Sequence, residues 1–249
     1  MKSLGGAIFC CNAIKYDYHI VESVLNLKEF CDQVVVLDAG STDGTQDLIT
    51  PLADEKCMVI LLNEWDQAQG MGSFKLSHFA NKAMDMLDTD YIYHAQSDEI
   101  LHEDSFPWIR KAMEDGKEGY MCRRYNLWKD PQHMLNVEQA RKPCSTEIVR
   151  LAKRHYRAVD DAESLGCPSV HIDYLDKIEV FHLGFVRNKE IMKEKIRNMQ
   201  LNVFEMSDYD RRLDKHEHFE AMDYFKPEDI IPIVKPLPKV IQAWASSRP

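Results

Sequence analysis

The sequence predicts an α/β fold with an open, mostly parallel sheet that carries helices on both faces. Two patterns support this prediction. In the first hundred residues, short apolar runs alternate with segments whose apolar residues recur at helical spacing, which gives the order strand, helix, strand. The runs are continuous and rich in β-branched residues, as in QVVVLD at residues 33–38. Such runs are typical of parallel strands that are covered on both faces.

The elements of the first half follow from local patterns. A helix is predicted at 18–30 because its apolar residues recur every three or four positions. The helix at 45–52 follows the turn AGSTDG, in which Asp43 is expected to be the N-cap and Gln46 its capping-box partner. The expected elements are, in order, a strand at 4–11, a helix at 18–30, a strand at 33–38, a helix at 45–52, a strand at 58–62, a helix at 73–87 and a strand at 91–95.

The second half is less regular. Five prolines from Tyr224 onward exclude a long helix there and predict an extended tail. We therefore expect one α/β domain over 1–222, with halves at 1–104 and 105–222, and a Pro-rich extension at 223–249. The elements expected after residue 104 are a helix at 106–113, strands at 119–127, 146–151 and 177–185, and a Lys/Arg-rich helix at 189–204.

Composition excludes several classes of protein. The formal net charge is −10, from 31 basic and 41 acidic residues, which argues against a protein whose affinity comes from a basic surface that neutralises phosphates. No apolar run is long enough for a membrane-spanning helix, and the apolar part of the N-terminus is too short for a signal peptide, so a cytoplasmic protein is expected. The seven cysteines are scattered and lack a Cys-x-x-Cys pair, which predicts reduced thiols rather than disulfides or a zinc site.

Ligands of open α/β sheets bind at the carboxyl ends of the strands, and two acidic motifs stand there. In VVVLDAGSTDGT, Asp38 ends a strand and could hold a ribose or base edge, although a purely structural junction would use the same small residues. In YIYHAQSDEIL, Asp98 and Glu99 follow the strand at 91–95, where a divalent cation could neutralise them together with a diphosphate. An acidic turn that caps the next helix is the alternative reading of this second motif.

Together these motifs resemble the GT-A glycosyltransferases of family 2, over residues 4 to 199. VVVLDAGSTDGT is similar to the family motif whose first Asp contacts the nucleoside, which falls on Asp38, with Ser41 in the same turn. LSHFANKAM resembles the helix before the metal motif, but Ala80 stands at a position that is usually basic, and Lys75 could supply that charge. Asn12, after the first strand, is a further candidate for contact with the base. The first half, 1–104, is then the nucleotide-sugar-binding half.

The resemblance also implies a metal site for Mn2+ or Mg2+. AQSDEIL lies where the family carries Asp-x-Asp; Gln96 replaces the first Asp, and Asp98 stands at the direct metal ligand. FHLGFVR resembles the family's His-x-Gly segment, which makes His182 a further metal or diphosphate ligand and Arg187 a candidate diphosphate contact. The neutral Gln96 weakens the prediction of metal binding, because a carboxylate would hold or orient the ion more strongly.

The catalytic carboxylate is expected in YRAVDDAE. Asp161 is the preferred base, with Asp160 and Glu163 as neighbouring candidates, and a solvated acidic loop is the alternative. Inverting transfer needs one base to take the proton of the acceptor as its oxygen attacks the anomeric carbon. The resemblance thus implies a metal-dependent, inverting enzyme that moves a sugar from a nucleotide-diphosphate sugar, with a UDP-sugar favoured, to a hydroxyl of a saccharide or glycan.

Three other functions stay open. The same fold could glycosylate a modified DNA base, although the net negative charge places nucleic acid second. A nucleotidyltransferase should carry a Gly-rich, basic loop after the first strand, which CCNAIKYDY does not resemble. Gln96 and Ala80 leave room for a nucleotide-binding or scaffold protein that has lost catalysis. The oligomeric state cannot be inferred from the sequence.

Overall fold

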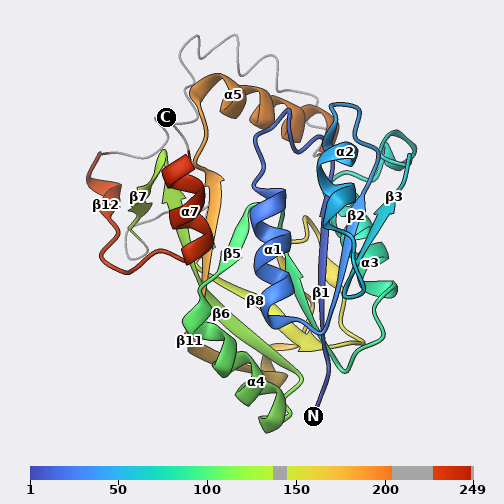
Figure 1. Cartoon of the computed structure of the whole chain (residues 1–249), viewed down its shortest axis with the longest axis vertical. Helices are drawn as coiled ribbons and strands as arrows, with labels where there is room; N and C mark the ends of the chain where they lie inside the picture. Colours follow the sequence, from blue (N-terminus) through green and yellow to red (C-terminus); the bar gives the residue numbers. More distant parts are fainter. Residues whose placement is uncertain (137–144, 204–226, 248–249) are drawn as a thin grey trace.

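A computed structural model describes residues 1–136, 145–203 and 227–247, and the predicted α/β fold is confirmed (Figure 1). Within these residues, a ten-stranded sheet carries the order β12-β7-β6-β8-β4-β1-β2-β3, while β11 pairs with β6 and β5. The strands are β1 (Leu4–Cys10), β2 (Gln33–Asp38), β3 (Cys57–Leu61), β4 (Tyr91–Ala95), β5 (Glu99–Leu101), β6 (Gly119–Trp128), β7 (Asp130–Leu135), β8 (Glu147–Lys153), β11 (Ile172–Phe185) and β12 (Ile230–Pro232). A separate hairpin joins β9 (Ala158–Val159) and β10 (Ser164–Leu165).

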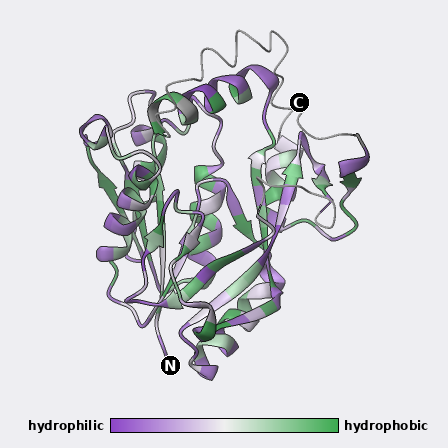
Figure 2. Cartoon of the chain, turned by 180° about the vertical axis from the view of Figure 1, so that it is seen from behind, coloured by the Kyte–Doolittle hydropathy of each residue, from purple (hydrophilic) through white to green (hydrophobic). Residues whose placement is uncertain are grey.

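The first half is a parallel sheet between two helical layers. β1 runs parallel to β2 and β4, and β2 runs parallel to β3. Because side chains alternate along a strand, Ile8 of β1 packs in the core cluster of α1 (Ile20–Phe30), while Ala7 packs with α3 (Phe74–Asp85) on the other face. The strands are correspondingly hydrophobic in Figure 2. This arrangement is the reason why the apolar runs of the first half are continuous.

The second half extends the sheet with antiparallel strands. β8 lies between β4 and β6 and is antiparallel to both, and β7 continues from β6 as the next antiparallel strand. β11 is longer than the predicted strand at 177–185; it runs parallel to β6 and antiparallel to β5. Its register places His182 beside both Glu99 and Asn126. The sheet therefore brings β11 to the loop that carries Asp98.

Two helices in the last third of the chain correct the predictions. The helix predicted at 189–204 is α5 (Lys189–Asn198), which continues as a π-helical turn at Met199–Val203. The tail is not wholly extended, because α7 (Lys239–Ser247) follows Pro238 and packs beside α1, with the Trp244 ring 4.6 Å from that of His19. The predicted boundary between 222 and 223 lies outside the described residues. Figure 1 shows α5 above the sheet and α7 next to α1; α4 (Phe106–Asp115) lies at the opposite end.

The helix predicted at 45–52 begins differently from the expected capping box. α2 (Thr45–Ile49) has Gly44 as its N-cap, with φ 92°, and a short 3₁₀ turn follows at Thr50–Leu52. Asp43 accepts hydrogen bonds from the amide and hydroxyl of Thr45 (3.0 and 2.6 Å). Gln46 does not complete a capping box; its Nε2 donates to Asp38 Oδ1 at 2.8 Å. The polar residues of this turn therefore organise the end of β2.

The described residues contain free cysteines and no candidate membrane-spanning helix. Six cysteines lie in the described residues, and all six are free thiols; Cys144 lies outside them. No helix in the described part of the chain is both long enough and apolar enough to cross a membrane.

Candidate active site

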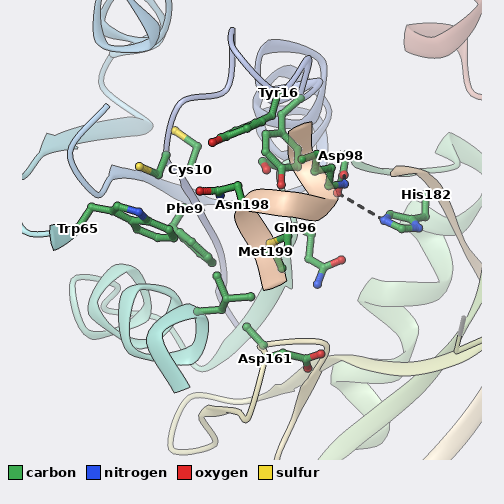
Figure 3. Close-up of a pocket in the computed structure, with 16 residues that line it drawn as sticks. Phe9, Cys10, Tyr16, Trp65, Gln96, Asp98, Asp161, His182, Asn198 and Met199 are labelled. Atoms are coloured by element: carbon green, nitrogen blue, oxygen red, sulfur yellow. Dashed lines mark hydrogen bonds and ion pairs between the residues drawn. The ribbon is translucent and has the colours of Figure 1, made fainter. Parts of the chain in front are cut away.

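A cavity opens beyond the carboxyl ends of β1 and β4, between the sheet and α5. Aromatic and thiol side chains from the first half form one side, and polar groups from the loop after β4, from the loop before β10, from β11 and from the end of α5 form the other (Figure 3). Its lining consists of Phe9, Cys10, Cys11, Tyr16, Tyr18, Trp65, Leu76, Gln96, Ser97, Asp98, Asp161, Ala162, His182, Lys195, Asn198 and Met199.

Asp98 is the most heavily paired carboxylate in this cavity. Its backbone carbonyl accepts the amide of Leu183 at 2.8 Å, which ties the loop to β11. Oδ1 lies 3.5 Å from Nε2 of His182, and Oδ2 lies 3.2 Å from Arg187 Nη2 and 3.3 Å from Lys195 Nζ. Burial opposes the charge of Asp98, but the cations Lys195 and Arg187 outweigh it and hold the pKa of this carboxyl well below its ordinary value. Asp98 is therefore ionised.

His182 is oriented by Asn126 of β6. The amide nitrogen of Asn126 donates to the Ser145 carbonyl at 3.3 Å, so its oxygen faces the ring and lies 2.8 Å from His182 Nδ1. This arrangement assigns the ring proton to Nδ1 and leaves Nε2 directed at Asp98 (Figure 3). Burial lowers the pKa of His182.

Two cations share the single charge of Asp98. Tyr18 lies between them and the aromatic side of the cavity, with its ring centroid 5.0 Å from the Arg187 guanidinium and 4.7 Å from Lys195 Nζ. Burial and the neighbouring Arg187 lower the pKa of Lys195 to about 8, so the ammonium predominates at neutral pH. Among the residues that the structure describes, one positive charge therefore remains uncompensated beside Asp98, and such a surplus favours a phosphate ligand.

Glu99 turns away from the cavity. Its carboxylate pairs with Arg150 through two hydrogen bonds, of 2.7 and 2.6 Å, and with Arg124 at 3.4 Å. Burial opposes ionisation, yet Arg150 and Arg124 lower the pKa of Glu99 to about 2. The cation site that the sequence suggested for the Asp98 and Glu99 pair is therefore corrected: only Asp98 faces the cavity.

Acidification should remove the stability that Glu99 contributes. Because its pKa in the folded protein is below the unfolded value of 4.5, that contribution is full above pH 4.5 and is lost as pH falls toward 2. We expect the difference in unfolding free energy between the wild type and Glu99→Gln to shrink by about 3 kcal/mol between pH 5 and pH 2. Urea denaturation at several pH values measures it. The matched control is Glu114→Gln at an exposed position on α4. If the difference in unfolding free energy between the wild type and Glu99→Gln is the same at pH 5 and pH 2, the ion pairs of Glu99 with the two arginines are contradicted.

Of the three predicted catalytic carboxylates, only Asp161 lines the cavity. Asp160 is exposed, and Glu163 pairs with Arg124 and accepts the Ser145 hydroxyl at 2.8 Å. Burial raises the pKa of Asp161, and the charges of Glu163 and Asp160 add to that shift. A carboxylate whose pKa is raised is a stronger base once it is ionised.

The nucleoside-binding candidates form a network next to the cavity. Asp38 is fully buried; its Oδ1 accepts the amides of Gly40 and Ser41 (3.0 and 2.8 Å), and its Oδ2 accepts the Ser41 hydroxyl. The Asn12 side chain accepts the Thr42 amide at 2.8 Å. Cys10, which lines the cavity, has its Sγ 3.6 Å from Asp38 Oδ2. Asp38 thus holds the loop after β2 at the cavity.

A family model described as "Glycosyl transferase family 2" matches residues 7–169, more than half of the chain. The chain belongs to glycosyl transferase family 2. The crystal structure of S. aureus TarS is similar at 14% identity with a TM-score of 0.48, over 91% of this chain and 46% of that one, so this transferase spans about half the length of that protein. TarS 1–349 in complex with UDP-GlcNAc matches with the same identity and TM-score, over 91% of this chain and 77% of that one. No curated protein matches the sequence.

The donor atoms of the transferase fit the divalent cation that the family implies. Asp98 Oδ1 and His182 Nε2 are both acceptors in the assigned tautomer, and their separation of 3.5 Å suits two neighbouring ligands of one ion, each at about 2.1 Å. In the described part of the chain, no three His, Cys, Asp or Glu side chains could hold a metal together. Substrate oxygens and water would supply the remaining ligands, which is the usual manner of Mg2+ binding.

The structure brings together some of the predicted residues and not others. Four of the predicted residues line the cavity: Gln96, Asp98, Asp161 and His182. Arg187 does not line it, but its guanidinium pairs with Asp98. Lys75 is buried beside it, with Nζ 4.1 Å from the ring centroid of Trp65. The predicted residues that do not line the cavity are Asn12, Asp38, Ser41, Lys75, Asp160, Glu163 and Arg187.

Sequence reasoning missed Lys195, Tyr18 and Trp65. Lys193, two residues before Lys195, lies on the exposed face of α5 with its Nζ 3.4 Å from Glu190. Lys195 shares a helical face with the buried Met192, three residues earlier. Helical spacing from Met192 would therefore have singled out Lys195.

Proposed function

We propose that the chain transfers a sugar, with inversion, from a UDP-sugar to a hydroxyl group of a saccharide or glycan. One observation carries the proposal: Asp161 lies in the same cavity as the cluster of Asp98, His182 and Lys195. A candidate base and a candidate diphosphate site thus line one space. The family match supports the reaction class.

The donor would lie across the cavity. Its diphosphate would contact Lys195, and the buried Arg187, paired with Asp98, would add its charge to that of the ammonium near the phosphate oxygens. Its base would lie on the aromatic side, where Tyr16 and Trp65 offer ring faces for stacking. The cation held by Asp98 and His182 would stabilise the charge that develops on the leaving diphosphate.

Asp161 would act on the acceptor. Its carboxylate would take the proton of the acceptor hydroxyl while the acceptor oxygen forms a bond to the anomeric carbon. The bond between that carbon and the diphosphate oxygen breaks on the opposite side, and its electron pair leaves with the diphosphate. Lys195 would hold this leaving group in place as its charge grows, and the charge of the nearby Arg187 would add to that of Lys195.

Calorimetry of nucleotide binding tests the donor assignment. UDP, GDP and CDP are titrated into the protein with Mn2+ and again with excess chelator. We expect UDP to bind most tightly and its affinity to fall more than about tenfold with chelator, or more than about 1.4 kcal/mol. Equal binding of all three nucleotides would contradict the UDP preference, and binding that is insensitive to chelator would contradict the metal assignment. Hydrolysis of a UDP-sugar without acceptor separates an enzyme from a scaffold protein.

A further inference from the structure

A buried cluster of four charges joins the Asp98 loop to the loop of the proposed base. It consists of Glu99 from β5, Arg124 from β6, Arg150 from β8 and Glu163. All but Glu163 are almost fully buried, at 0–3% exposed. Two positive and two negative charges balance, so the cluster needs no further ion.

Arg150 is the centre of this cluster. Two of its guanidinium nitrogens donate to the Glu99 carboxylate, and the third, Nη1, donates to the backbone carbonyl of Glu163 at 2.7 Å. Arg124 also connects Glu99 to Glu163, because its guanidinium lies 3.4 Å from the Glu99 carboxylate and pairs with the Glu163 carboxylate. Glu99 is thereby linked to Glu163 along two routes.

The Glu99 carboxylate also contacts the loop that follows β4, on the other side of the cavity. Glu99 Oε2 accepts the backbone amide of Gln96 at 3.2 Å. Gln96 lines the cavity two residues before Asp98. Glu99 therefore contacts both the loop that presents Asp98 and, through Arg150, the loop that presents Asp161.

The loop of Asp161 has a backbone that needs such anchoring. Asp160 and Ala162 both adopt left-handed conformations, with φ of 48° and 60°, which costs free energy for residues other than glycine. The Ala162 carbonyl lies 2.9 Å from His94 Nε2, and the Glu163 amide donates to Asp161 Oδ1 at 3.2 Å. Glu163 is the point at which Arg150, Arg124 and the Asp161 side chain meet.

We propose that Arg150 and Glu99 are positioning residues that hold Asp161 at the cavity through Glu163. The proposal rests on the proposed function, in which Asp161 is the base. A base displaced by about 1 Å loses about a hundredfold in rate, because proton transfer requires hydrogen-bond contact with the acceptor hydroxyl. The cluster also fixes the position of the Asp161 loop relative to the loop of Gln96 and Asp98. The Glu99 carboxylate contacts the Gln96 loop directly and the Asp161 loop through Arg150.

The double variant Glu99→Met/Arg150→Met tests the proposal. Methionine approximates the volume of both side chains, and replacement of both partners leaves no unpaired buried charge between them, so the fold is expected to persist. Arg124 and Glu163 still pair in this variant. The matched control is Arg110→Met/Asp32→Met, which removes another two-hydrogen-bond pair, both of 2.9 Å, that bridges α4 and the start of β2 away from the cavity.

Two readouts separate positioning from a general loss of structure. We expect kcat of the double variant to fall about a hundredfold. The Kd for UDP with Mn2+ should rise far less than kcat falls, because Asp98, His182 and Lys195 are unchanged and the Leu183 amide still holds the Asp98 loop to β11. A variant that loses UDP binding and transfer equally, or that keeps kcat within about threefold of the wild type, overturns the proposal. The control should retain both values.

Hydrogen exchange makes the anchoring measurable without turnover. Backbone amides at 158–165 should exchange at least about tenfold faster in the double variant than in the wild type, with α1 and α3 unchanged. Unchanged protection at 158–165 overturns the anchoring whether or not sugar is transferred. If the wild type transfers no sugar while exchange accelerates, the proposed function fails and the anchoring stands.

Discussion

Replacement of Asp98 by asparagine is expected to lower the transfer rate about a thousandfold, which corresponds to about 4 kcal/mol of lost transition-state stabilisation. A neutral amide oxygen holds a divalent ion far more weakly than a carboxylate does, and the Asp98 carboxylate lies 3.5 Å from His182. Initial rates with a UDP-sugar measure the loss. Asp104→Asn, at a side chain that is 89% exposed and six residues away, is the matched control.

The same substitution should destabilise the fold, and a second change should separate the two effects. Asp98→Asn leaves the buried cations Arg187 and Lys195 without their counter-charge, which is expected to cost about 3 kcal/mol. Asp98→Asn/Lys195→Met removes one of these charges and should recover part of that stability in thermal unfolding, but it should recover no metal-dependent UDP binding. Binding of UDP that stays metal-dependent in Asp98→Asn would show that the ion is held elsewhere.

The first half could be predicted from sequence because its signals are local. The continuous apolar run at 33–38 coincides with β2, and the run at 91–95 coincides with β4, since strands buried on both faces need no alternation. α7 and β12 were not predicted. Each is short, and each is stabilised by non-local contacts, such as that of Trp244 with His19 and that of β12 with β7. Prolines at 232, 236 and 238 suggested only an extended chain.

The site was predictable as a set of motifs but not as a geometry. Asp98 and Glu99 are neighbours in sequence, yet one faces the cavity and the other faces Arg150, because Asp98 belongs to the turn that precedes β5 and Glu99 is the first residue of the strand. Arg124 and Arg150 could not be assigned without the antiparallel pairing of β6 with β8. The orientation of His182 likewise depends on β11 lying beside Asn126.

Replacement of Asp161 by asparagine should lower kcat by about a hundredfold to ten-thousandfold, the usual contribution of general-base catalysis, with little change in the KM for the donor. The fold should be as stable as the wild type or slightly more stable. Burial and the charge of Glu163 raise the pKa of Asp161, so its ionised form opposes folding above that pKa, and the amide removes this cost. Asp160→Asn discriminates between the neighbours: if it is the slower variant, the assignment of the base is wrong.

The pH dependence of kcat offers an independent check of the same residue. Asp161 must be ionised to accept a proton, so activity should fall as pH drops through its pKa, and that pKa is above the ordinary value of 3.8. Glu163→Gln removes the neighbouring charge but keeps a side chain that can accept the Ser145 hydroxyl. The acidic limb of the kcat profile should therefore move to lower pH in Glu163→Gln and should disappear in Asp161→Asn. A limb that stays in place in both variants would mean that a different group takes the proton of the acceptor.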